Sequence, residues 1–314
     1  MTVPTDPRPR SSKRVGDVPV KLVDASSLED FEVAIHDSEA RAIDTETVYT
    51  PQAFSGPNAA PGALRVISAA TRDSQGFDQA WVIDVTSVNR SSIAKILSGV
   101  TADAWNADFD SLVLDRDLFG PAREVDNSVE PITWWDAQLA DALLHQGRTG
   151  FSFYHGLAWA VEWYLGLSVE GKGTTQLSYT DTDALSEEQV MYAAADAVET
   201  LWVAEEIRTR IRNTGLLEVC RLEQQARPFL DQMERVGLPF DWSGWACDVL
   251  GYAMGCPCDG SGMRGWACDG LGMRWVRDLR TDRPGRRCRR RSHSGLGPRI
   301  RFGHLASPGF ATGL

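Results

Sequence analysis

Two acidic side chains interrupt a run of residues that otherwise predicts a buried β-strand. The run, Arg41–Thr47, is rich in apolar and β-branched residues, and it contains Asp44 and Glu46. Because successive strand side chains point to opposite faces, the two carboxylates share one face. Burying two carboxylates is costly unless they are paired or bind a metal ion. The chain must therefore fold so that compensating groups reach this strand.

Two further motifs place polar groups four residues apart, the spacing that aligns side chains on one side of a helix. They are Asn106 with Asp110, and Tyr192 with Asp196. Taken singly, such pairs are usually solvated surface, because the chain has 43 acidic residues, and Asp108 is an alternative to Asp110. Together they form a set of four carboxylates and one tyrosine. Hard oxygen ligands of this kind suit two divalent ions that hydrolyse a phosphodiester.

The pattern along residues 20–213 alternates between strands and helices, which predicts an α/β domain with a mixed sheet covered by helices. A capping box at Ser186 marks the start of a long helix. The expected strands are Arg41–Thr47, Leu64–Ala70, Ala80–Val85, Ala102–Trp105 and Ile132–Trp135. The expected helices are Ser91–Ser98, a segment ending near Phe119, Asp136–His145, Phe151–Leu165, Ser186–Arg212 and Leu216–Arg235.

The three motifs, in this order on this pattern, resemble the Exo I, Exo II and Exo III segments of the DEDD 3′–5′ exonucleases. Tyr192 places the chain in the DEDDy branch. More specifically, the chain is similar to the proofreading domain of family A, polymerase I-like DNA polymerases of phages and bacteria. Supporting segments are 136–140, 171–179 and 222–241, the last resembling the start of a polymerase thumb. The resemblance covers about residues 20–241.

This resemblance implies a ribonuclease H-like sheet flanked by helices, and a role for each motif residue. Asp44, Glu46 and Asp196 would hold one Mg²⁺ or Mn²⁺, while Asp44 and Asp110 would hold a second. Tyr192 would aim the attacking water, so that the catalytic set is Asp44, Glu46, Asp110, Tyr192 and Asp196. Asn106 and Asp136 are supporting residues. The implied reaction releases 5′-mononucleotides from DNA 3′ ends.

The expected substrate is a single-stranded or frayed DNA 3′ end, because the reacting phosphate must sit deep among the ions. Phe151, Phe153 and Tyr154 are candidates to stack on unpaired bases, although core packing is their more common role. No role is assigned to Lys172 or Gln176. Two alternatives remain open: an RNA-trimming exonuclease like ribonuclease D, and a non-catalytic remnant that binds DNA ends.

The resemblance has two departures. The loop at 48–63 is longer than the family's usual turn, and beyond Asp241 the resemblance stops. Palm and fingers domains need several hundred residues, so no polymerase activity is expected from this chain. A separately supplied polymerase or other replication protein is a compatible partner.

The net charge of −11 is unevenly distributed. Residues 242–314 contain twelve arginines, no lysine and five aspartates, a net charge of +7, so residues 1–241 carry −18. An acidic body argues against a protein that coats nucleic acid, although bound cations reverse the local field at a carboxylate site. No signal peptide or membrane-spanning run is evident, so the cytoplasm is the expected location and no membrane partner is expected.

Four segments are expected: a disordered lead-in at 1–19, the exonuclease domain at 20–213, a thumb-like helix at 214–241 and an irregular tail at 242–314. The tail repeats the sequence Gly-Trp-Ala-Cys-Asp at 244–248 and 265–269 and holds five of the six cysteines. One interpretation is a genuine appendage, and the favoured one is a frameshifted or unselected gene end. Cys256 and Cys258 are too closely spaced for an ordinary structural zinc site.

Overall fold

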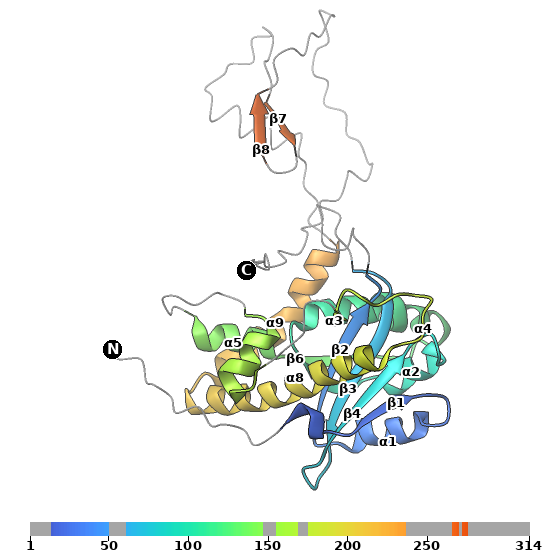
Figure 1. Ribbon diagram of the computed structural model, residues 1–314. Helices are drawn as coiled ribbons and strands as arrows, with labels where there is room; N and C mark the ends of the chain where they lie inside the picture. Colours follow the sequence, from blue (N-terminus) through green and yellow to red (C-terminus); the bar gives the residue numbers. More distant parts are fainter. Residues whose placement is uncertain are drawn as a thin grey trace, which may run out of the picture. The chain divides into compact units, whose positions relative to one another are not determined.

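The computed structural model describes residues 14–49, 61–146, 155–168, 175–236, 266–269 and 272–275. A six-stranded mixed sheet with order β1-β4-β3-β2-β5-β6 forms the centre of one compact unit (Figure 1). The strands are β1 Val20–Val23, β2 Ala40–Thr47, β3 Leu64–Arg72, β4 Asp78–Asp84, β5 Thr101–Ala104 and β6 Thr133–Asp136. Strands β2, β3 and β4 pair antiparallel, while β1 joins β4, and β5 joins both β2 and β6, in parallel.

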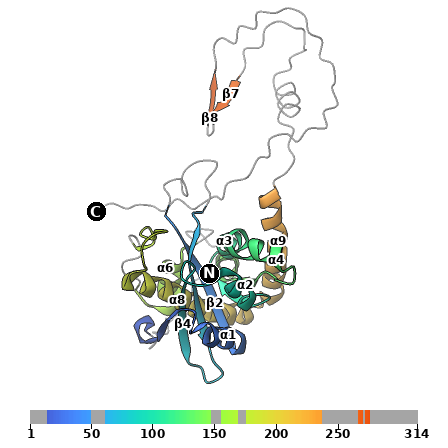
Figure 2. The ribbon, with the colours of Figure 1, turned by 90° about the vertical axis from the view of Figure 1, so that its right-hand side faces the viewer.

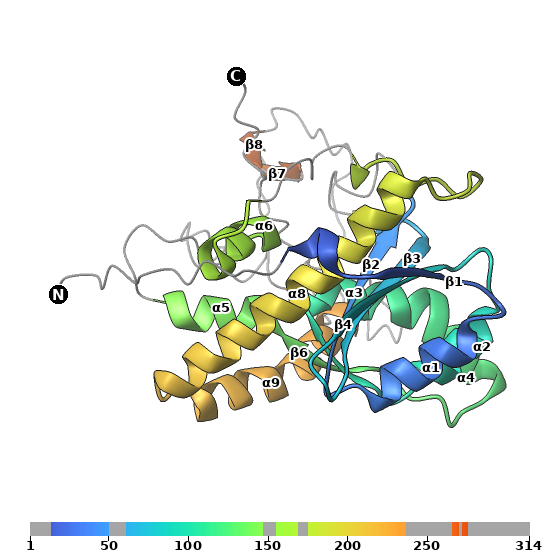
Figure 3. The ribbon, with the colours of Figure 1, turned by 60° about the horizontal axis from the view of Figure 1, so that its bottom comes forward.

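Helices cover both faces of this sheet, which confirms the predicted α/β class. They are α1 Leu28–Asp37, α2 Arg90–Ile96, α3 Ala107–Leu114, α4 Gly120–Val125, α5 Ala137–His145, α6 Leu157–Ala160, α8 Glu187–Asn213 and α9 Leu217–Val236. With the sheet seen nearly edge-on in Figure 2, α6 and α8 lie on one side of β2, and α2, α3 and α4 lie on the other. Figure 3 shows α8 running across the sheet.

The alternation along β2 assigns its residues to two separate hydrophobic clusters. Ile43 belongs to the cluster that α1, α2, α3 and α4 complete. Ala42 belongs to the cluster that α5, α6 and α8 complete. Asp44 and Glu46 therefore share the face of Ala42, under α8, whereas Thr45 shares the face of Ile43. This division determines from which side each part of the chain approaches the centre of β2.

Several predicted elements differ from the structure at their ends. Strand β1 and helix α1 were not predicted. Only Val23 of β1 is buried, so the strand shows no alternation of apolar and polar residues. The helix predicted to end near Phe119 instead passes through a π-turn, η3 Asp115–Phe119, into α4. Of the helix expected over Phe151–Leu165, residues 151–154 lie outside the described residues, and Leu157–Ala160 form α6 with the extended Gly156 at its N-cap. It continues as a π-turn, η4 Val161–Leu165.

Other observations concern the chain's outer segments. Within the predicted lead-in, Val15–Asp17 form a short 3-10 helix, η1. Within the tail, β7 Trp266–Asp269 and β8 Gly272–Trp275 pair as an antiparallel hairpin, which the sequence did not predict. This hairpin lies in a second compact unit. No helix among the described residues is both long and apolar enough to cross a membrane.

A fully buried arginine ties the sheet to the segment that precedes α8. Arg65, on β3, donates from Nε to the Thr180 carbonyl at 2.7 Å and from Nη2 to the Asp183 carbonyl at 2.7 Å. Its Nη1 forms an ion pair with Asp84 and donates to Thr86 Oγ1 at 3.0 Å. Four of its five N–H groups thus have an acceptor, and such pairing is the condition for burying a guanidinium.

Replacing Arg65 with leucine should lower the free energy of unfolding by about 3–5 kcal/mol, because Asp84 and two carbonyls lose their buried partner. Urea denaturation measures the loss. Arg221→Leu, at an exposed ion pair on α9, is the matched control and should change stability by less than about 1 kcal/mol. A loss from Arg65→Leu no larger than that of the control would show that the buried network is not stabilising.

Candidate active site

The two acids of β2 lie side by side on the face that α8 covers. Asp44 is opposite Ser68 of β3, and Glu46 is opposite Val66. Glu46 is buried and Asp44 is half-buried. The register shifts between Glu46 and Thr47, so the regular ladder is interrupted directly beyond the second acid. The prediction that both carboxylates point to one face agrees with this register.

Helix α8 brings Asp196 to the same place. The helix begins with the predicted capping box, in which the Ser186 side chain accepts from the Gln189 N–H. Ala193 and Ala197 flank Asp196 and are fully buried, so small side chains let the helix approach the sheet closely. Oxygen atoms of Asp44, Glu46 and Asp196 lie within 4.8 Å of one another. Residues separated by about 150 positions thus converge on one cluster.

Tyr192 lies one helical turn before Asp196 and faces the same cluster. Burial, followed by the charges of Asp196, Glu46 and Asp44, raises the pKa of the Tyr192 phenol well above its usual value. The phenol is therefore protonated at every physiological pH and is available as a hydrogen-bond donor. Its position and protonation suit the orientation of a water molecule beside the three carboxylates.

Asp110 approaches the centre of β2 from the opposite face of the sheet. Its Oδ1 accepts hydrogen bonds from the Thr45 N–H at 2.9 Å and from the Thr45 hydroxyl at 2.7 Å. Thr45 stands between Asp44 and Glu46, so Asp110 is attached to the same three-residue segment. The pKa of Asp110 is raised to about 7, mainly by burial and also by the charge of Asp136, although the Thr45 hydrogen bonds and the charge of Arg227 lower it. Asp110 therefore lies next to the segment that carries Asp44 and Glu46, but it is not a member of the 4.8 Å cluster of Asp44, Glu46 and Asp196.

The two residues predicted as supporting have defined structural roles. Asn106 precedes α3 in the left-handed conformation, with φ of 64° and ψ of 57°. Asparagine tolerates this region better than most residues. The turn at Asn106 sets the direction in which α3, which carries Asp110, leaves the end of β5. Asp136 is buried and caps α5 by accepting from the Gln138 and Leu139 N–H groups. The alternative acid, Asp108, is partly exposed and forms an ion pair with Arg227.

The donor set fits a hard divalent ion. Asp44, Glu46 and Asp196 offer only carboxylate oxygens, which Mg²⁺ and Mn²⁺ prefer, and Asp110 adds another from the neighbouring face. Three carboxylates gathered under a helix carry charge that a bound cation offsets. The arrangement does not distinguish between the two ions.

Sequence reasoning missed two residues that frame the site. Tyr179 is fully buried, its hydroxyl donates to the Gln189 carbonyl at 2.9 Å, and its own carbonyl accepts from the Tyr49 N–H at the end of β2. Arg65 then holds the following residues, 180 and 183. The available signal was an arginine within the apolar run of β3. Phe151, Phe153, Tyr154 and Lys172 lie outside the described residues, and Gln176 is exposed.

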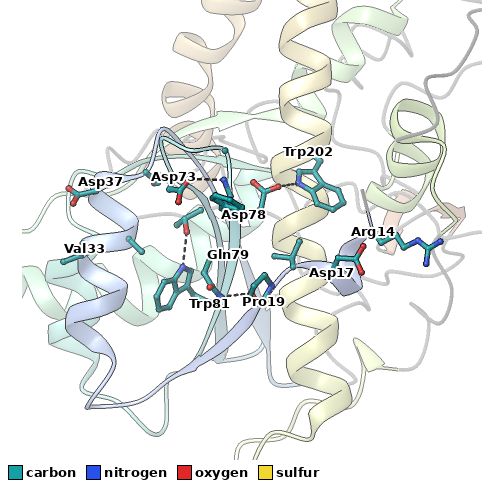
Figure 4. Close-up of a pocket in the computed structure, with 16 residues that line it drawn as sticks. Arg14, Asp17, Pro19, Val33, Asp37, Asp73, Asp78, Gln79, Trp81 and Trp202 are labelled. Carbon is teal, nitrogen blue, oxygen red and sulfur yellow. Dashed lines mark hydrogen bonds between the residues drawn. The ribbon is translucent and has the colours of Figure 1, made fainter. Parts of the chain in front are cut away.

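A separate pocket of about 650 Å³ lies beside the β3–β4 turn (Figure 4). Asp17 and Pro19 line it from the N-terminal segment, and Trp81 and Trp202 line it from β4 and α8. The Trp202 indole donates to Asp78 at 2.7 Å within it. None of the five predicted catalytic residues contributes to its lining, so this pocket is distinct from the acidic cluster.

This chain belongs to the 3′–5′ exonuclease family, whose model matches residues 20–212. The prediction of a 3′–5′ exonuclease domain is thereby confirmed. The polymerase I-like branch remains a prediction. No curated protein sequence matches the chain.

Solved structures of exonucleases share the fold. The ribonuclease D of Trypanosoma brucei in complex with GMP is 17% identical, covering 62% of this chain and 58% of that one, with a TM-score of 0.50. The EXO domain of Aedes aegypti Nibbler is 20% identical over 65% and 95% of the two chains, with a TM-score of 0.50. The catalytic core of Trypanosoma brucei RRP6 is 19% identical over 68% and 53%, also at 0.50. The match thus spans less than two thirds of the ribonuclease D and RRP6 structures.

Asn106→Gly should leave the free energy of unfolding nearly unchanged, whereas Asn106→Ala should lower it by about 1–2 kcal/mol. The reason is that alanine is penalised in the left-handed region and glycine is not. The Asn106 side chain makes no cap hydrogen bond, so the pair of variants isolates the backbone effect. Denaturant midpoints provide the measurement, and equal midpoints for the two variants would contradict the assignment.

The metal-free protein should lose stability as the pH rises from about 4 to about 7. The pKa of Asp110 is 3.8 in its ordinary state and about 7 when folded, so in this window the folded chain holds a proton that the unfolded chain releases. Added Mn²⁺ should stabilise the protein more at pH 8 than at pH 5, because ion binding requires the carboxylate. Thermal melting across this range, with a chelator or with Mn²⁺, measures both effects.

Asp110→Asn is the control for this pH dependence, because it keeps the shape of the side chain and removes its titration. Melting temperatures of the variant should fall less steeply between pH 4 and 7 than those of the wild type. If the two slopes coincide, another group is responsible for the pH dependence.

Proposed function

We propose that this chain is a metal-dependent 3′–5′ exonuclease that removes 5′-mononucleotides from DNA 3′ ends. The observation that carries the proposal is the cluster of Asp44, Glu46 and Asp196 oxygens within 4.8 Å, in a chain of the 3′–5′ exonuclease family. Tyr192 lies beside this cluster, and Asp110 is bonded to the residue between its two β2 members. Four carboxylates and a tyrosine in this arrangement suit two-metal hydrolysis.

The carboxylates divide the metal-holding role between them. Asp44, Glu46 and Asp196 would hold one divalent ion, and Asp44 and Asp110 a second, as the family resemblance suggests. Such ions supply an activated water and neutralise the charge that develops on the phosphate oxygens. The buried carboxylates fix these positions in advance, so that little reorganisation is needed during the reaction.

Tyr192 serves as the orienting group. Its phenol remains protonated because burial and the neighbouring carboxylates raise its pKa, so it donates a hydrogen bond rather than accepting a proton. A water oxygen held by this donor attacks the terminal phosphorus, and the bond from phosphorus to the 3′ oxygen of the preceding nucleotide breaks. The products are a 5′-mononucleotide and a chain shortened by one residue.

Two sequence segments outside the three motifs favour DNA as the substrate. The segment 171–179 and the thumb-like junction at 222–241 resemble proofreading domains. The first of these ends at Tyr179, which is buried and bonds both α8 and the end of β2. The proposal also includes a frayed DNA end as the substrate and a cytoplasmic location. It further includes an exonuclease domain at 20–213 and a thumb-like helix at 214–241.

RNA is the second candidate substrate. It is favoured by the folds of the solved relatives, which include a ribonuclease D in complex with GMP. The likeness to those proteins concerns the fold, and the identity of 17–20% leaves the substrate to experiment.

Degradation of 5′-labelled single-stranded DNA and of an RNA of the same sequence, each with Mg²⁺ or Mn²⁺, tests the proposal. A ladder that shortens from the 3′ end, faster on DNA and abolished by a chelator, is the expected result. Asp44→Asn should lower kcat by about 10²–10³-fold or more, because it removes a charged ligand. Tyr192→Phe should lower kcat by about 10²-fold with little change in ion requirement.

Glu32→Gln is the matched control, because it makes the same carboxylate-to-amide change on the exposed face of α1. It should retain the wild-type rate. If the chain trims RNA faster than DNA, then RNA is the preferred substrate and the proposal of DNA is wrong. If the folded wild-type chain degrades neither polymer, the catalytic proposal is wrong and the non-catalytic DNA-end-binding protein is the remaining alternative.

A further inference from the structure

Helix α9 lies beyond the family-matched residues, yet its first half is bonded to the acidic site. The Gln224 side chain accepts from the Asp136 N–H at 2.9 Å and donates to the Asp136 carbonyl at 2.8 Å. Cys220, one turn earlier, is buried in the cluster that α5 and α8 complete. The start of α9 is therefore fixed to the end of β6, where Asp136 begins α5.

Arg227, one turn after Gln224, is placed between two carboxylates. It is buried, forms an ion pair with Asp108 on α3, and its Nη1 lies 3.3 Å from Asp136 Oδ2. Asp110 follows Asp108 by two residues, and the charges of both Asp136 and Arg227 act on it. One guanidinium thus neutralises two acids that adjoin the Asp110 side of the site.

Without this cation, Asp108 and Asp136 would form a second pair of carboxylates close to Asp110. Carboxylates that share a site attract divalent cations, as we propose for the cluster of Asp44, Glu46 and Asp196. An ion drawn to that pair would compete for Asp110 with the ion that the proposed mechanism places between Asp110 and Asp44. The permanent positive charge of Arg227 excludes such an ion, because it neutralises both carboxylates at once.

We propose that Arg227 is a tethered cation of the exonuclease site, which fills the position between Asp108 and Asp136 and keeps divalent ions on the Asp44 side of Asp110. Arg227 is accordingly a positioning residue, and the functional unit extends through α9 to at least residue 227. The inference rests on the proposed function, in that it takes Asp44, Glu46, Asp110 and Asp196 as the ion ligands.

Calorimetric titration of Mn²⁺ into the metal-free full-length chain tests this proposal without requiring activity. Arg227→Met removes the guanidinium, and Arg227→Lys keeps the charge. Combining Arg227→Met with Asp136→Asn also removes one carboxylate, while asparagine still accepts the cap hydrogen bonds of α5. Arg221→Met, which breaks an exposed 2.6 Å pair with Glu218 on the same helix, is the matched control.

Arg227→Met should bind one more Mn²⁺ per chain than the wild type, and the double variant should return to the wild-type number. Arg227→Lys and Arg221→Met should match the wild type. In parallel, kcat on the oligonucleotide should fall by about 10- to 100-fold in Arg227→Met and recover in the double variant. A merely structural arginine would not change the number of bound ions.

An unchanged Mn²⁺ number in folded Arg227→Met, or an extra ion that persists in the double variant, would overturn the proposal. Circular dichroism establishes folding, and Arg227→Gln, read in the same way, replaces the methionine variant if that one does not fold. Absence of nuclease activity in the wild type would contradict the proposed function. The number of bound Mn²⁺ ions tests the proposed role of Arg227 separately, because it does not depend on activity.

Discussion

The burial of carboxylates around the centre of β2 is the constraint on which the rest of this structure depends. Glu46, Asp110, Asp136 and Asp196 are all less than one tenth exposed. Each buried carboxylate needs a proton, a hydrogen-bond donor or a cation to offset its lost hydration. Asp110 receives two donors from Thr45, and Asp136 receives helix N–H groups and Arg227. The remaining cluster of Asp44, Glu46 and Asp196 is the part for which we propose divalent ions.

The alternation of β2 organises the approach of these groups. Because Asp44 and Glu46 face α8 while Thr45 faces α3, a strand of eight residues connects acids that arrive on both sides of the sheet. Small residues of α8 bring Asp196 close from one side, and the left-handed turn at Asn106 directs Asp110 from the other. The centre of the sheet thus fixes where the acids from its two sides meet.

Local regularities made much of this predictable. The two-residue spacing of Asp44 and Glu46, the four-residue spacing of Tyr192 and Asp196, and the Ser186 capping box each depend on nearby residues. Strand β1 was missed because two of its four side chains are exposed and no alternation results. Arg65 and Arg227 were missed because their partners lie up to 118 and 119 positions away, and nothing local predicts which acceptor a charged side chain will reach. Tyr179 was missed because no local pattern predicts that its carbonyl accepts from the distant Tyr49 N–H.

Pro228 directly follows Arg227 inside α9. Proline has no N–H with which to bond the carbonyl four residues earlier, which belongs to Gln224, so the helix is weakened immediately behind the two side chains that contact Asp136 and Asp108. The boundary between the two compact units falls just beyond, after Phe229. The missing backbone hydrogen bond thus separates the residues of α9 that contact Asp136 and Asp108 from the part of the helix that belongs to the second unit.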